Sequence, residues 1–88
     1  MEDQYRERML KRLHLPADVM EGAPILTMMG KNQIYLENYR GILEYDDKLV
    51  KVQTKMGVLV ISGKNICIDS FDVDEMEITG TFHDICYQ

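Results

Sequence analysis

The stretch LVKVQTKMGVLVI, residues 49–61, indicates the fold class of this chain. Apolar and polar residues alternate in its first half, as they do in a strand with one face on a core and one in water. Residues 58–61 are apolar at every position, which is typical of a strand inside a sheet. Because Gly57 between them is a turn residue, the stretch predicts two antiparallel strands joined by a short turn.

Short strands of this kind continue on both sides, from Ile25 to Tyr87, and are separated by Gly, Asn and Asp. Seven or eight strands with tight turns predict a mainly β fold, an antiparallel meander forming a small roll or sandwich. A short solenoid-like stack is the alternative, because the later strands recur at similar spacing. In the last strand, Phe82 and Ile85 fall out of alternating phase, which predicts a bulge. The predicted strands are residues 25–29, 33–39, 42–45, 49–54, 58–61, 66–70, 75–79 and 81–87.

The N-terminal residues predict an amphipathic helix over 3–13, in which Tyr5, Met9 and Leu13 form one apolar stripe. This stripe packs either on the chain's own β domain or on a partner or membrane. The chain is therefore divided into an N-terminal helix (1–14), a turn-rich connector (15–24) and a β domain (25–88).

Composition narrows the function classes. No apolar run approaches the roughly 20 residues that span a bilayer, and the charged N-terminus lacks a signal-peptide core, so we expect a cytoplasmic protein. Residues 66–88 contain six Asp or Glu and no Lys or Arg, which argues against nucleic-acid binding through that part. A basic cluster suited to an acidic partner or anionic lipid is formed by Arg6, Arg8, Lys11 and Arg12.

Catalytic, cofactor and metal sites are not predicted. The acidic segment 72–77 lacks the third carboxylate and the glycine of a calcium loop. His83, Asp84 and Cys86 do not share one strand face as a nucleophile and its base would, and no glycine motif for phosphate is present. We expect a non-enzymatic protein, in which Cys67 and Cys86 are buried reduced thiols rather than a disulfide or part of a zinc site.

The tyrosines suggest a binding surface. If residues 33–39 form one strand, Tyr35 and Tyr39 share a face opposite Ile34 and Leu36. That face is either an exposed interface, for which tyrosine is typical, or a second apolar face beneath the N-terminal helix.

Several motifs together carry a family resemblance. The most specific is Glu37-Asn38-x-Arg40-Gly41-Ile42; the others are LPADV (15–19), GAP (22–24), TKMG (54–57), ISGKN (61–65) and EITG (77–80). With these motifs the chain resembles the YabP/YqfC family of sporulation proteins, in particular its YqfC branch. Residues 13–87 are covered by the resemblance.

The resemblance implies a small protein without enzymatic activity, made during endospore formation in the mother cell of a Gram-positive bacterium. Its expected role is that of an adaptor for a membrane-anchored sporulation partner in forespore-envelope development, peripheral to the forespore membrane. The helix stripe or a face containing Tyr35, Tyr39 and Arg40 would bind that partner. The alternative is a structural component of a spore layer that self-assembles through strand edges.

Overall fold

The computed structural model describes residues 22–88, so the expected N-terminal helix and most of the connector lie outside the described residues. The described part forms one antiparallel sheet of six strands. The strands are β1 (Ile25–Met29), β2 (Gln33–Glu37), β3 (Tyr39–Tyr45), β4 (Leu49–Thr54), β5 (Gly57–Phe71) and β6 (Glu75–Tyr87). This confirms the mainly β class.

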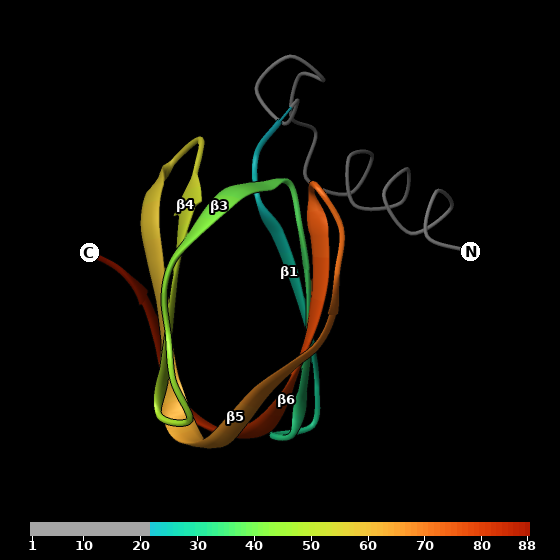
Figure 1. Ribbon diagram of the computed structural model, residues 1–88, viewed down its shortest axis with the longest axis vertical. Helices are drawn as coiled ribbons and strands as arrows, with labels where there is room; N and C mark the ends of the chain where they lie inside the picture. Colours follow the sequence, from blue (N-terminus) through green and yellow to red (C-terminus); the bar gives the residue numbers. More distant parts are fainter. Residues whose placement is uncertain (1–21) are drawn as a thin grey trace.

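The strand order is β1-β2-β6-β5-β4-β3, so only β3 to β6 follow one another as a meander. The β1–β2 hairpin joins the sheet at β6. The sheet curls into a roll, with β1, β2 and the β5–β6 hairpin on one side and β3, β4 and the start of β5 on the other (Figure 1). All five strand pairs are antiparallel. The parallel coils of a solenoid are therefore not present in the described part.

Six strands replace the seven or eight expected, because two glycines are corners inside long strands rather than turns. A Cβ on Gly63 would lie 2.0 Å from the carbonyl oxygen of Thr81. Gly80 has a φ of +148°, and a Cβ there would lie 3.0 Å from the Cα of Ile66. β5 and β6 bend at these residues and approach so closely that no side chain fits between them.

Register shifts accompany the corner. Asp84 pairs with Ser62, and Phe82 with Gly63, which leaves one extra residue, His83, in β6. The bulge predicted from the phase of the last strand is thereby confirmed.

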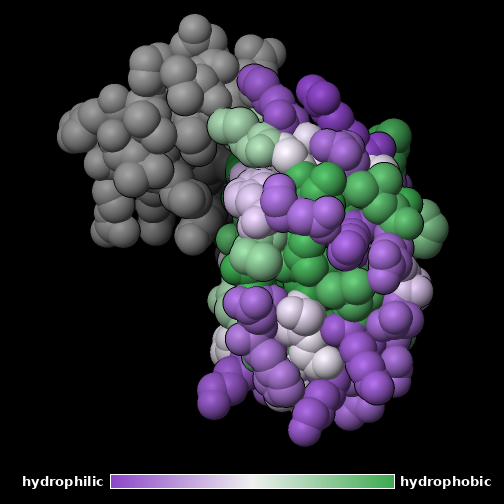
Figure 2. Space-filling view, turned by 90° about the vertical axis from the view of Figure 1, so that its left-hand side faces the viewer, coloured by the Kyte–Doolittle hydropathy of each residue, from purple (hydrophilic) through white to green (hydrophobic). Residues whose placement is uncertain are grey.

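The core lies inside the roll. It consists of the side chains that point inward, which are every second residue along the strands. Burying each of these side chains contributes about 1.5–3 kcal/mol. The fully buried hydrophobic residues are Ile34, Leu36, Val50, Val52, Ile61, Met76 and Ile78. On the outside, Figure 2 shows one face of the roll, where apolar surface occupies the middle and hydrophilic residues lie above and below it. In residues 22–88 no helix has the length and hydropathy to cross a membrane.

The strand predicted over 33–39 is wrong. β2 ends at Glu37. Asn38 has a φ of 66°, in the left-handed region, and this backbone conformation separates β2 from β3, which begins at Tyr39. Tyr39 is therefore the first residue of another strand and is buried, at 5% exposure. Asn tolerates this conformation better than other residues with a side chain.

Candidate functional site

The turn between β5 and β6 exposes two apolar side chains among acidic ones. We call residues 71–75 the acidic hairpin tip. The N–H of Asp72 donates to the carbonyl of Glu75 at 2.6 Å, which closes the turn. Phe71 is 66% exposed and Val73 is 87% exposed. Large apolar side chains at this exposure in a short turn are candidates for contact with a partner.

Asn38 and Tyr39 hold the acidic hairpin tip against the body of the roll. The backbone N–H of Asn38 donates to the carbonyl of Asp74 at 2.6 Å, and its side-chain Nδ2 donates to the carbonyl of Ala23 at 2.9 Å. The Tyr39 hydroxyl donates to the carbonyl of Asp72. These contacts join the tip, the β2–β3 connection and the start of the described chain, so the tip is fixed before any partner binds.

Burial raises the pKa of Tyr39 above its ordinary value, and the negative charges of Asp72 and Asp74 add to the effect. At neutral pH the phenol is protonated and can donate its hydrogen bond. The contact to the acidic hairpin tip is therefore maintained over the physiological range.

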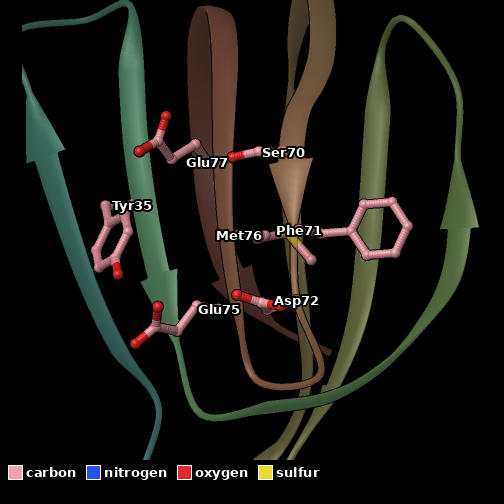
Figure 3. Close-up of a pocket in the computed structure, with 7 residues that line it drawn as sticks. All are labelled: Tyr35, Ser70, Phe71, Asp72, Glu75, Met76 and Glu77. Carbon is pink, nitrogen blue, oxygen red and sulfur yellow. The ribbon is translucent and has the colours of Figure 1, made fainter.

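A shallow cavity of about 140 Å³ lies beside the tip on the outer face of the sheet. In Figure 3 the carboxylates of Glu75 and Glu77 lie on either side of the Tyr35 ring, and the Phe71 ring points the other way. The pairing of Tyr35 with Glu77 explains this arrangement, because residues opposite each other share one face. The complete lining is Tyr35, Ser70, Phe71, Asp72, Glu75, Met76 and Glu77.

Comparison with known proteins places the chain in a family. The model of the YabP family matches residues 21–88. This chain belongs to the YabP family. It is also 38% identical over 77 residues to a Bacillus subtilis (strain 168) protein described as uncharacterized protein YqfC, covering 88% of this chain and 83% of that one. The resemblance to the YabP/YqfC family is confirmed.

The most specific motif of that resemblance, residues 37–42, has a structural place in this YabP-family chain. Glu37 is 4% exposed. Asn38 and Tyr39 make the contacts to the acidic hairpin tip, and Arg40 is exposed at the start of β3. Asn38 of the motif therefore helps to position the tip, and the role of Arg40 in partner binding stays a prediction.

The structure separates the residues that the sequence grouped as a partner-binding face. Tyr35 is half-buried on the outer face of β2. Tyr39 and Arg40 are both in β3, where Tyr39 is buried and Arg40 is exposed. The remaining predicted residues, Tyr5, Met9, Leu13, Arg6, Arg8, Lys11 and Arg12, lie outside the described residues and stay predictions. Phe71 and Val73 were missed, although two apolar residues alternating with aspartates in a turn were a readable signal.

The cysteines differ from expectation. Cys67 and Cys86 are both free and exposed, so the prediction that they are buried is wrong. Cys86 pairs with Val60, between the buried inward positions Leu59 and Ile61, and thus lies on the outer face. Within residues 22–88, no three His, Cys, Asp or Glu side chains are grouped as metal ligands would be.

Proposed function

We propose that this YabP-family protein is a non-enzymatic adaptor in endospore formation that binds a membrane-anchored partner through the acidic hairpin tip. The observation that carries the proposal is the exposure of Phe71 and Val73 on a turn that Asn38 and Tyr39 hold in place. The sporulation context comes from the family resemblance, and we place the protein in the mother-cell cytoplasm, peripheral to the forespore membrane.

The chemistry of the tip indicates the kind of partner. Apolar anchors surrounded by polar residues are typical of protein interfaces, in which a few buried side chains supply most of the affinity. Because the tip is already ordered, binding costs little additional conformational entropy. Asp72, Asp74 and Glu75 around the anchors favour a partner segment that carries Lys or Arg next to apolar residues.

The second hypothesis, a spore layer built by strand-edge pairing, requires two different matching edges on each molecule. One outer edge of the sheet is β3, which contains Arg40 and Glu44 and two register shifts against β4. Charged and bulged edges resist pairing with another strand. We therefore favour the adaptor over a continuous layer.

The test is recovery of the partner by tagged protein from detergent-solubilised membranes of sporulating cells of the native host. Phe71→Ser with Val73→Ser removes both anchors. Met56→Ser is the matched control, because Met56 is 57% exposed in the turn between β4 and β5. We expect the wild type and the control to recover the same membrane protein and the tip variant to lose it.

Equal recovery by the tip variant would exclude the tip as the binding site. Recovery of the protein alone in large assemblies would favour the structural layer. The variant Met9→Asp with Leu13→Asp, tested alongside, shows whether the apolar stripe expected in the N-terminal segment also contacts the partner.

A further inference from the structure

The C-terminal half of β6 has an open edge. β6 lies between β2 and β5, but β2 pairs only with residues 75–79. The turn between β1 and β2 covers the next residues, since the N–H of Phe82 donates to the carbonyl of Lys31 at 3.1 Å. Within residues 22–88, no strand pairs with residues 84–88 on the side away from β5.

The hydrogen-bond phase shows which groups this edge presents. The N–H of Gln88 donates to the carbonyl of Val58 at 2.8 Å, so Gln88 belongs to a hydrogen-bonded pair with β5. Pairs alternate along an antiparallel ladder, and Cys86 is therefore also hydrogen-bonded to β5. It follows that the N–H and C=O groups of Ile85 and Tyr87 point away from β5, toward the open side.

We propose that this edge pairs, antiparallel, with the same edge of a second copy about a two-fold axis at Cys86. The bulge at His83 ends the regular ladder with β5, and an axis at Cys86 is the register that pairs the outward-pointing groups of Ile85 with those of Tyr87. In this register Ile85 of each copy lies opposite Tyr87 of the other. The two pairs supply about four backbone hydrogen bonds.

The side chains on this edge fit a second copy. The side chains of residues 85–88 are uncharged in a chain with a net charge of −5, so they add no repulsion between two copies. Tyr87, at 50% exposure, packs against Ile85, and such aromatic and β-branched pairs stabilise antiparallel strands.

β6 runs from the side of β1 and β2 across the bottom of the roll to the opposite side, where the C-terminus lies (Figure 1). Cys86 is next to Val60 on the outer face, so pairing would continue one outer face across both copies. The outer edge formed by β3 is charged and bulged, so it does not offer the same match. The inference does not depend on the proposed adaptor role.

The test is sedimentation equilibrium of the full chain under reducing conditions. We expect the wild type to dimerise with concentration. Cys86→Lys places two like charges opposite each other across the axis and should raise the dimer dissociation constant by up to about fivefold. Cys86→Ser should remain dimeric. Cys67→Lys is the matched control. Cys67 is also exposed, but it lies opposite Thr79, on the other side of the corner from Cys86.

Oxidation of the same proteins with diamide tests the position of the axis. Across the proposed interface Cys86 faces Cys86 in a non-hydrogen-bonded pair, whose Cα atoms lie about 4.5 Å apart, within disulfide range. Cys67→Ser should therefore form a disulfide-linked dimer, and Cys86→Ser should not. A monomer at every concentration, larger assemblies, crosslinking through Cys67 alone, or a dimer unchanged by Cys86→Lys would each overturn the proposal.

Discussion

Replacing Gly63 with alanine tests the corner at which β5 and β6 cross. A Cβ at this position would lie 2.0 Å from the carbonyl oxygen of Thr81 and 3.0 Å from the Cα of Phe82. Ordinary contact begins near 3.4 Å, so the two backbones must separate by about 1.4 Å. Both contacting atoms belong to the backbone, and no side-chain rotation can relieve them.

The cost follows from this separation. Overpacking in a rigid site costs about 1–3 kcal/mol, and each ladder hydrogen bond lost at the corner adds about 1 kcal/mol. We expect Gly63→Ala to lower the free energy of unfolding by about 3 kcal/mol or more, out of a total of about 5–15 kcal/mol for a domain. For a chain of this length, the melting temperature should fall by at least about 12 °C.

Urea unfolding of a glycine series measures the effect. A Cβ on Gly41 would have no atom within 4 Å, and Gly41 has no positive φ, so Gly41→Ala should change stability by less than about 0.5 kcal/mol. Gly30 is equally open but has a φ of +61°, so Gly30→Ala should cost about 1–2 kcal/mol from backbone strain alone. If Gly63→Ala proves no more costly than Gly30→Ala, the crossing is not as close as described.

Two further predictions concern the contacts that hold the acidic hairpin tip. Tyr39→Phe removes the hydroxyl that donates to Asp72 and should lower the free energy of unfolding by about 1 kcal/mol at pH 7. Because the folded-state pKa of Tyr39 is raised above 10.0, the stability held by the protonated phenol is present below pH 10 and lost as the pH rises further. Urea unfolding at pH 7 and above pH 10 should show a smaller alkaline loss in Tyr39→Phe, and an equal loss would contradict the assignment. Asn38→Ala should cost about 1 kcal/mol more than Asn38→Gly in the same assay, since both lose the bond to Ala23 but only alanine is strained at a φ of 66°; equal costs would show that the left-handed φ is unimportant.

Alternation along the chain was enough to place the strands that have one buried face. β4 begins and ends at the predicted residues, 49–54, because its side-chain period and flanking turns agree. β1 also has its predicted bounds, 25–29, but it has no buried residue, so its flanking turns alone placed it. The period also revealed the bulge at His83, since one extra residue reverses the phase of all that follow.

Glycine was the main source of error, because the same residue permits a turn and a close crossing. Gly63 and Gly80 stand in sequences that resemble turns, yet each is required by a backbone on the other strand. Which strand lies opposite is a property of the assembled sheet, and the local sequence does not contain it. The break between β2 and β3 at Asn38 was easier to predict from the sequence, because Asn is one of the few residues that adopt a positive φ readily.

The candidate site was predicted less well than the fold. Grouping Tyr35 with Tyr39 depended on one unbroken strand, and a single residue of positive φ between them separated the two side chains. Likewise, Cys67 and Cys86 looked like core residues by type, whereas pairing places both on the outer face. Type and spacing suggest a face, but register decides which face it is.

The bent strands have a consequence for how the molecule opens. β5 and β6 each run through both sides of the roll, so neither side has a sheet that is complete without the other. If one side of the roll opens, β5 and β6 lose hydrogen-bonded neighbours there, and the same two strands belong to the other side. The roll is therefore a single cooperative unit, in which the middle of β5 and β6 opens only when the whole domain unfolds.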